Sequence, residues 1–373
     1  MKAAVRAWSE LLRISALFTV PGDALAGAAA LGRRPDRGTA LAVGASLCLY
    51  EAGMALNDWA DRDEDAIDRP HRPIPSGRIT PGAALAAAGA LTAAGLTLAA
   101  RAGRPALTVA TGLAATVWAY DLHLKHTQAG PAAMAGARAL DLLLGATATA
   151  GTGAGYMGVK RPVSATGASH AVRSAGTVLP TRTARILRGA RALGRARAAS
   201  PAQSMGPART THPGVRAAVP AAALLGAHTY AVTAVSRHEA QGGSTVAPLG
   251  ALAAIVALGA AAVREQRGSR SVPPVPVKGG PGDHHRPRPG APAPRLLLTA
   301  LTAAYLRTAA KPLLHATLNP SPPLTQRAVG GGIRAMIPLQ AVLAARAGAS
   351  GTGLAVMGLV PLARTLARKV SLT

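Results

Sequence analysis

The chain is poor in cysteine, in aromatic residues and in acidic residues. Its single cysteine, Cys48, excludes an intrachain disulfide framework and a multi-cysteine metal site. Aromatic residues make up only 2% of the chain, which leaves few rings on which nucleic-acid bases could stack. Of the 373 residues only 15 are acidic, against 41 lysines and arginines, so the formal net charge is +26. A surplus of this sign usually indicates an anionic partner, either nucleic acid or lipid.

Long apolar segments rich in alanine, leucine, glycine and valine are abundant instead. Hydrophobic residues make up 49% of the chain, and the mean hydropathy is positive. Runs of about 18 to 25 such residues recur, each long enough to cross a bilayer as a helix. Most lack the polar face of a helix in a soluble protein. We therefore expect an all-α, polytopic membrane helical bundle of about nine transmembrane helices. They are expected near residues 11–32, 38–57, 81–101, 105–122, 131–157, 216–236, 246–264, 293–314 and 328–348, with a further apolar stretch at 351–367.

Two segments interrupt the apolar pattern. Residues 158–214 hold ten lysines and arginines and no acidic residue, and residues 265–292 are rich in proline and glycine, as solvated loops are. We favour a disordered insertion for the first segment over a basic helix on anionic lipid. A shifted reading frame in a GC-rich gene would give the same composition. The expected parts are the first section of the bundle at 1–157, the Arg-rich insertion at 158–214, a helix pair at 215–264, the loop at 265–292 and the C-terminal membrane helices at 293–373.

The basic insertion also raises the hypothesis of a nucleic-acid-binding role. Residues 158–214 contain no aromatic residue, so bases would find no stacking platform there. Positive charge alone gives salt-sensitive binding without sequence preference. We therefore expect no specific nucleic-acid partner.

The few acidic residues are concentrated in one place. Six of the 15 lie between Asp58 and Asp68, directly after an apolar segment. A continuous helix would put Asp58, Asp61 and Asp65 on one face, with Asn57 on the same side. Like charges so close repel unless a cation lies between them, and oxygen donors at this spacing suit Mg²⁺. A solvated acidic loop explains the spacing equally well.

The segment that follows favours the metal site. The sequence HRPIPSGRITPG combines prolines that stiffen a turn with Arg72 and Arg78, cations that can bind phosphate oxygens. Charged groups at membrane depth usually line a polar cavity. Acids for a metal and arginines for phosphate, beside a membrane helix, therefore indicate a diphosphate carried on an apolar chain.

These residues resemble the signature of the UbiA superfamily of intramembrane prenyltransferases. Asn57, Asp58, Asp61 and Asp65 match the pattern NDxxDxxxD, and RPIPSG at 72–77 is similar to the segment that accompanies it in that family. Because the family has nine membrane helices, the resemblance covers most of the helical chain. It does not cover the two interrupting segments.

A second likeness follows the fourth expected helix. The sequence AYDLHLKHT, with Tyr120, Asp121 and Lys125, looks like the family's tyrosine-containing loop. The resemblance implies that Arg72 and Lys125 bind the phosphate oxygens of the substrate. It also implies that Tyr120 is catalytic, because its ring face can stabilise an allylic carbocation.

The resemblance implies a magnesium-dependent membrane prenyltransferase. Asn57, Asp58, Asp61 and Asp65 would hold Mg²⁺ on an isoprenyl diphosphate, with the three aspartates in the catalytic role, and Asn57 would also contact the substrate. The metal would stabilise diphosphate as it leaves. The prenyl group would then pass to a small lipophilic acceptor, often an aromatic ring or a quinone precursor. Such a protein is integral to a lipid bilayer, which we expect to be the cytoplasmic membrane of a bacterium.

The chain departs from the family after the sixth expected helix, where two aspartates four residues apart are normal. The sequence AHTYAVTAVSRHEAQGGS has no aspartate there, and Glu239 is its one acidic residue. Glu239 could bind substrate through a second Mg²⁺, helped by His228 or His238. A simple position of His238 and Arg237 at the water interface explains them as well. This stretch also resembles the divergent UbiA-like branch of Ebo-type gene clusters. The alternative function is therefore a non-catalytic protein that binds or moves an isoprenoid-linked metabolite.

Overall fold

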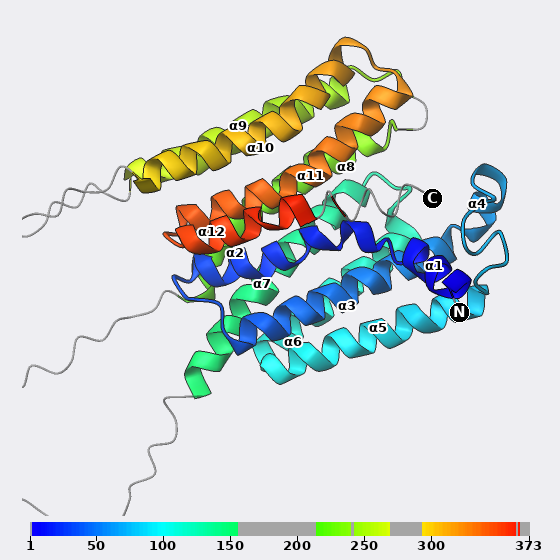
Figure 1. Cartoon of the computed structure of the whole chain (residues 1–373), viewed down its shortest axis with the longest axis horizontal. Coiled ribbons are helices and arrows are strands. Elements are labelled where there is room, and N and C mark those ends of the chain that lie inside the picture. Colours follow the sequence, from blue (N-terminus) through cyan, green and yellow to red (C-terminus); the bar gives the residue numbers. More distant parts are fainter. Residues whose placement is uncertain (1, 156–213, 240–241, 269–292, 363–364, 366–373) are drawn as a thin grey trace, which may run out of the picture. The chain divides into compact units, whose positions relative to one another are not determined.

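Helices are the regular elements of the part of the chain that the structure, a computed structural model, describes: residues 2–155, 214–239, 242–268, 293–362 and 365 (Figure 1). In chain order they are α1 (Lys2–Leu11), the 3-10 helix η1 (Ile14–Thr19), α2 (Pro21–Ala30), α3 (Arg37–Ala60), α4 (Arg62–Asp68), α5 (Pro81–Ala102), α6 (Arg104–Ala119), the π-helix η2 (Tyr120–Leu124), α7 (Gly130–Gly155), the 3-10 helix η3 (Val215–Ala218), α8 (Val219–Ser236), α9 (Val246–Gly268), α10 (Ala293–Leu318), α11 (Pro322–Arg346) and α12 (Ser350–Met357).

Five of the described helices are long and apolar enough to cross a membrane. They are α3, α5, the segment Val215–Ser236 that contains α8, the part of α9 up to Arg264, and α11. The expected all-α membrane bundle is confirmed, whereas the number of nine spans stays a prediction. The Arg-rich insertion, apart from residue 214, and the Pro/Gly-rich loop, apart from residues 265–268, lie outside the described residues.

The expected first helix at 11–32 is wrong as a continuous element. Arg13 has φ 48° and ψ 46°, a left-handed conformation that ends one helix and starts another. A second junction follows at Pro21, the first residue of α2, where a proline is tolerated because the first helical N–H has no partner within the helix. The chain therefore forms α1, η1 and α2 in place of one span, and Arg13 lies at the first break.

Glycine and alanine allow the backbones of α2 and α7 to approach closely. A Cβ atom built on Gly27 would lie 2.2 Å from the carbonyl oxygen of Leu142, and one built on Gly145 would lie 2.3 Å from the Cα of Ala24. No side chain fits into either gap. Packing of small residues in this way is a principal source of helix association in lipid, where the hydrophobic effect between helices is weak.

Helix α7 packs on both sides. Its Leu142 and Ala146 belong to a buried apolar cluster with residues of α8, α9, α10 and α11. Its Leu144 and Ala148 belong to a second cluster with α3, α5 and α6. Polar residues on the N-terminal half of α7 therefore face the interior of the bundle rather than lipid.

Candidate functional site

A cavity of about 250 Å³ lies among α3, α6, η2 and α7. Its wall is largely apolar and carries polar groups at several places. The polar lining residues are Arg13, Ser46, Tyr50, Asn57, Tyr120, Asp121, Arg138 and Asp141, and the others include Leu49, Met54, Leu113, Val117 and Met134. An apolar cavity with a few convergent polar groups is typical of a small-molecule site.

The acidic motif spans a break between two helices. Helix α3 ends at Ala60, and Asp61 (φ −88°, ψ 4°) separates it from α4. The expected continuous helical face is therefore interrupted at Asp61. Asp58 remains on the last turn of α3 and is buried, whereas Asp65 is buried in α4. Asp61 is half-buried between them.

Arginines already neutralise the two buried aspartates. Asp58 Oδ1 accepts from Arg13 Nη2 at 3.1 Å and lies 3.4 Å from Arg72 Nη1. Asp65 Oδ2 lies 2.6 Å from Arg72 Nη1, and Arg69 Nη1 donates to its Oδ1 at 3.2 Å. Arg72 was expected to bind phosphate, and here it joins the two aspartates. Buried carboxylates without such partners would be strongly destabilising.

The turn RPIPSG holds Arg72 in this position. Ile74 and Ile79 are buried against α1, α3 and α5 and anchor the turn to the bundle. Gly77 has φ 72°, a backbone conformation that favours glycine. The Ser76 hydroxyl donates to the Arg72 carbonyl oxygen at 2.6 Å. The buried isoleucines and this internal hydrogen bond together fix the turn, which limits the movement of the Arg72 side chain.

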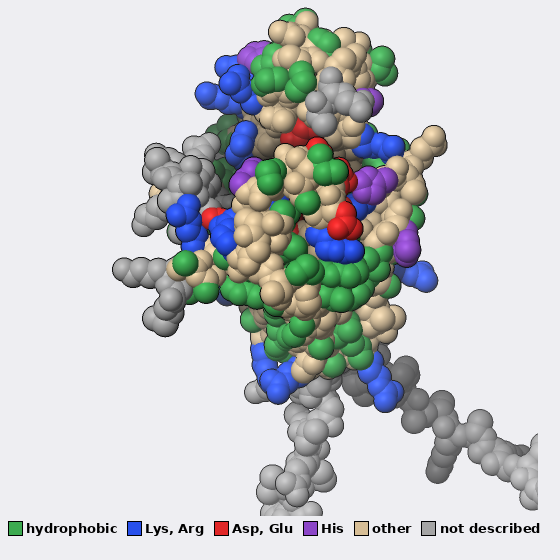
Figure 2. All heavy atoms as spheres, turned by 90° about the vertical axis from the view of Figure 1, so that its right-hand side faces the viewer, with side chains coloured by type: hydrophobic (Ala, Val, Ile, Leu, Met, Phe, Trp, Pro, Cys, Tyr) green, Lys and Arg blue, Asp and Glu red, His purple; other side chains and the backbone are tan. Residues whose placement is uncertain are grey.

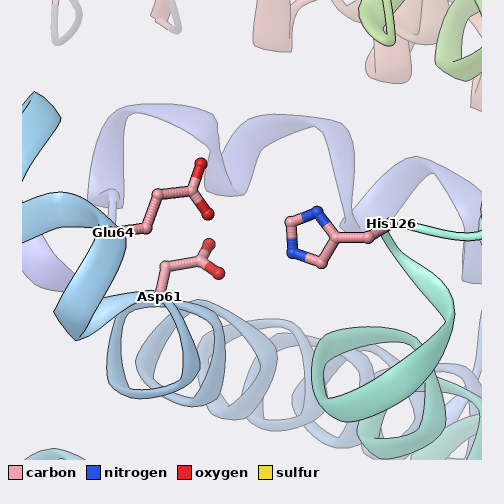
Figure 3. A group of neighbouring side chains, drawn as sticks. All are labelled: Asp61, Glu64 and His126. Atoms are coloured by element: carbon pink, nitrogen blue, oxygen red, sulfur yellow. The ribbon is translucent and has the colours of Figure 1, made fainter.

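Asp61 has its own polar partners within the site. Its Oδ1 pairs with the Lys125 ammonium, and its Oδ2 accepts from Asn57 Nδ2 at 3.2 Å. Among the described residues, Asp61, Glu64 and His126 are the group of three potential metal ligands whose donor atoms all lie within 4.8 Å of one another (Figure 3). The expected set of Asp58, Asp61 and Asp65 does not converge to this degree.

The tyrosine-containing loop reaches the site through a π-turn. The Lys125 N–H donates to the Tyr120 carbonyl oxygen at 3.0 Å, so one extra residue is accommodated in the turn. Such π-turns are frequent at functional sites. Tyr120 and Asp121 consequently line the cavity, and Lys125 faces Asp61. Gly53 of α3 permits the approach, since a Cβ there would lie 3.0 Å from Val117 Cγ1.

The segment after α8 approaches the same region with a different composition. Glu239 is half-buried, and burial raises its pKa, while the charge of Arg69 acts in the opposite direction. Arg237 donates to the Thr127 carbonyl oxygen at 2.6 Å and so connects this segment to the tyrosine-containing loop. His228, suggested as a helper of Glu239, is not among the residues that line the cavity. Its ring is fully buried, with its nitrogens 3.0 Å from Tyr305 Oη and from the Gly332 carbonyl oxygen.

A buried polar network lies at the α7 side of the cavity. Arg138 donates to Asp23 Oδ2 at 2.6 Å, and Gln340 Nε2 donates to Asp23 Oδ1 at 2.6 Å. Asp141 accepts from Ser46 and lies 4.0 Å from Arg138. Arg138 and Asp141 lie three residues apart on α7, yet the closer partner of Arg138 is Asp23, from a distant part of the chain.

Charged side chains gather on the face of the molecule that carries α4. Figure 2 shows acidic side chains there among basic side chains and histidines, next to a broad hydrophobic surface. Arg78 contributes to this gathering through an ion pair with Glu10, at 2.6 Å. Acids and bases are therefore interspersed, and this face can bind a metal ion and an anion side by side.

The oxygen donors at the end of α3 fit Mg²⁺. Both arginine contacts of Asp58 involve Oδ1, which leaves Oδ2 for a cation. Asn57 uses its amide nitrogen toward Asp61, and its amide oxygen remains a donor. Asp65 is less suitable, because arginines contact both of its oxygens. Hard oxygen ligands from one or two carboxylates, completed by water and phosphate, are what Mg²⁺ prefers.

Three residues of the site were missed by reasoning from the sequence. Arg13 was assigned to the inside of a membrane helix, and a charged residue at that depth was itself a signal for a polar cavity. Glu64 and His126 lie inside the quoted motifs, at positions to which the resemblance assigns no role, so both were overlooked. Asp121 was noticed without a role, and the structure places it in the cavity wall.

Comparison with known proteins identifies relatives over parts of the chain. A model of the UbiA prenyltransferase family matches residues 15–272. Digeranylgeranylglyceryl phosphate synthase of Methanopyrus kandleri is 36% identical over 128 residues, which are 33% of this chain and 45% of that protein. The protein of the same name from Ignicoccus hospitalis is 35% identical over 147 residues, 39% of this chain and 48% of that protein. The bacteriochlorophyll synthase 33 kDa chain of Rhodobacter capsulatus is 73% identical over 26 residues, 7% of this chain and 9% of that protein. The chain spans less than half the length of these curated relatives.

Solved structures share the fold over nearly the whole chain. A digeranylgeranylglyceryl phosphate synthase structure has a TM-score of 0.54 at 14% identity and covers 94% of this chain and 100% of its own. A UbiA homologue from Archaeoglobus fulgidus, bound to GPP and Mg²⁺, has a TM-score of 0.51 at 16% identity, with 94% and 99% covered. At this identity the likeness shows the fold alone. Since the family model matches well over half of the sequence, the chain belongs to the UbiA prenyltransferase family.

Proposed function

We propose that the protein is a magnesium-dependent prenyltransferase that works within the membrane on an isoprenyl diphosphate. The observation that carries this proposal is the cavity itself. The cavity combines a largely apolar wall with two lining residues, Arg13 and Asn57, that contact the charged groups of Asp58 and Asp61. An apolar chain joined to a multiply charged head group is the ligand that matches such a division.

The cations of the site are proposed to exchange partners when substrate binds. Arg13, Arg72 and Lys125 now neutralise Asp58, Asp61 and Asp65. A metal ion on the carboxylates would supply the same charge. Arginine and lysine are then available for the phosphate oxygens, which arginine binds in a forked geometry. Stabilisation of the departing diphosphate is the chemistry that Mg²⁺ would supply here.

The cavity wall is proposed to protect the reactive allylic cation. Leu113, Val117 and Met134 exclude water from the prenyl chain, which prevents capture of the cation by hydroxide or water. Tyr120 lines the cavity next to Asp121. Its ring face can stabilise positive charge on the first carbon of the chain by a cation–π interaction.

A non-catalytic function is the second candidate, favoured by the composition after α8. Glu239 is the one carboxylate of that segment, where the family has two aspartates. The proposed site therefore has fewer metal ligands with which to neutralise the diphosphate. In this case the protein binds an isoprenoid-linked molecule and moves it without breaking its phosphate bond.

The class of acceptor is proposed from the cavity and from the relatives, and the kind of membrane from the resemblance. The composition of the cavity suits a lipophilic acceptor, either an aromatic or quinone precursor, as the resemblance implies, or a lipid with a glyceryl phosphate group, as the names of several relatives suggest. The protein is integral to a membrane. We expect a bacterial cytoplasmic membrane, although most of the matched relatives are archaeal.

The test is diphosphate release by the detergent-purified full chain, with and without Mg²⁺, from geranyl, farnesyl and geranylgeranyl diphosphate. Binding of the same compounds is measured in parallel, and transfer is measured with one acceptor of each class. We expect Mg²⁺-dependent release, reduced by on the order of 100-fold or more in Asp58→Asn because a charged group at the reacting diphosphate is lost. Asp63→Asn is the matched control, since the Asp63 side chain is 86% exposed, pairs with Arg62 and does not line the cavity.

Each outcome distinguishes the candidates. Release that depends on Asp58 but not on Asp63 supports transfer. Tight Mg²⁺-dependent binding without release from any of the three compounds supports the non-catalytic candidate. Neither binding nor release, or full release by Asp58→Asn, would contradict the proposed site.

A further inference from the structure

We infer that Asp61, Glu64 and His126 form a binding site for a first-row transition-metal ion such as Mn²⁺ or Zn²⁺. The three side chains come from two elements that are far apart in sequence, the α3–α4 junction and the loop after η2 (Figure 3). One donor atom from each lies within 4.8 Å of the other two. This arrangement shares Asp61 with the carboxylates proposed above for Mg²⁺ and goes beyond that site through Glu64 and His126, which it does not use.

The donor set decides the class of metal. Two carboxylates and one imidazole form a mixed oxygen and nitrogen set. Imidazole nitrogen suits zinc and other first-row transition ions, whereas Mg²⁺ prefers oxygen ligands and keeps its waters. Three protein ligands leave coordination positions for water or for a phosphate oxygen, as in zinc sites that act on substrates.

The backbone holds the ligands in place. Asp61 lies between α3 and α4, with its N–H bonded to the Asn57 carbonyl oxygen, and Glu64 lies in the first turn of α4. His126 follows the π-turn and lies within a further turn closed by a 3.0 Å bond from the Thr127 N–H to the Leu124 carbonyl oxygen. Both Glu64 and His126 are exposed, which gives an ion a direct path from the aqueous phase.

Asp61 links this site to the charged cluster. Its Oδ1 now pairs with Lys125, and the side chain of Lys125 is only 11% exposed. An ion on Asp61 would replace that ammonium as the neutralising charge. Lys125 would then be released toward the cavity beside it. The transition-metal ion and the substrate diphosphate would thus both favour Lys125 turned away from Asp61 and toward the cavity.

The experiment uses Mn²⁺ as the probe on the detergent-purified full chain, with no isoprenyl diphosphate present. Pulsed electron paramagnetic resonance detects the ¹⁴N nucleus of a directly bound imidazole. We expect ¹⁴N coupling in the wild-type protein and its loss in His126→Ala. We also expect Mn²⁺ affinity to fall by about tenfold or more in His126→Ala and in Glu64→Gln, since even groups outside the ligand shell change affinity by about that factor.

Matched controls are present in the same segments. His123→Ala removes another exposed histidine three positions before His126, and Asp63→Asn removes an exposed acid next to Glu64. Both controls should keep the wild-type ¹⁴N coupling and the wild-type affinity. Zn²⁺ should displace Mn²⁺ at a lower concentration than Mg²⁺ does in the wild-type protein, and this preference should shrink in His126→Ala.

Several results would overturn the inference. They are an absence of ¹⁴N coupling in the wild-type protein, coupling that persists in His126→Ala, and an equal loss of affinity in the controls. These readouts involve no prenyl substrate, so they are separate from the proposed enzymatic function. A protein without diphosphate release could still show the coupling, and an active prenyltransferase could lack it.

Discussion

Removal of the Arg138 charge should lower the stability of the folded bundle substantially. In the structure Arg138 donates to Asp23 at 2.6 Å, and the Asp23 side chain is fully buried. The substitution Arg138→Gln keeps an amide donor and much of the volume but removes the positive charge. Asp23 then retains Gln340 as a neutral partner at 2.6 Å. A buried carboxylate without a counter-charge is the consequence.

The magnitude follows from the contact. Two unit charges about 4 Å apart interact by about 4 kcal/mol at an effective dielectric constant of about 20. Loss of one partner of a buried pair costs about 3–5 kcal/mol in measured cases, because the remaining charge stays desolvated. For domains of a few hundred residues this corresponds to a thermal midpoint lower by roughly 10 °C.

The assay is thermal unfolding of the purified protein in one detergent, with the wild-type protein, Arg138→Gln and the double variant Asp23→Asn/Arg138→Gln compared at equal scan rates. The double variant replaces the ion pair by two amides, so no uncompensated charge is left at position 23, whereas Asp141 loses its neighbour Arg138 in both variants alike. We expect it to recover at least half of the lost midpoint. A midpoint of Arg138→Gln within about 2 °C of the wild-type value, or a double variant less stable than the single one, would refute the reasoning.

Two further predictions concern packing and pH. Gly145→Ala should destabilise the protein by about 1–3 kcal/mol because its Cβ would lie 2.3 Å from the backbone of Ala24, whereas Gly136→Ala on the same helix meets nothing within 4 Å and should be neutral or slightly stabilising in the same thermal assay. Burial raises the pKa of Glu239 above its ordinary value of 4.5, so the folded state holds the proton more tightly than the unfolded state does. The thermal midpoint should therefore lose a contribution as pH rises from about 4.5 through the raised pKa. Glu239→Gln should remove this contribution, and an unchanged pH profile in that variant would contradict the prediction.

The sequence by itself determined the class of fold and its main elements. Apolar runs predicted α3, α5, α8, α9 and α11 close to their observed bounds, because a segment that crosses lipid must satisfy its backbone hydrogen bonds within its own helix. The resemblance of the acidic motif was sufficient for the family, which the comparisons confirm. Both are local properties, carried by residues adjacent in the chain.

Local patterns failed where the chain bends. The apolar run at 11–32 gave no sign that Arg13 adopts a left-handed conformation, and the spacing of the aspartates gave no sign that the helix ends before Asp61. Hydrophobic periodicity reports whether a segment prefers an apolar environment. It does not report where a helix must break to pack on its neighbours.

Only the tertiary structure decided which charges meet. Asp141 is the acidic residue nearest to Arg138 in the sequence, yet Asp23 lies closer in space, because the small residues of α2 and α7 bring the two backbones together. Likewise Asp61 and His126 become neighbours because the chain forms a π-helix at Tyr120–Leu124, which the sequence motif did not predict. Contacts across long separations depend on the angles and distances at which helices pack, and those are set by the fit of many side chains at once.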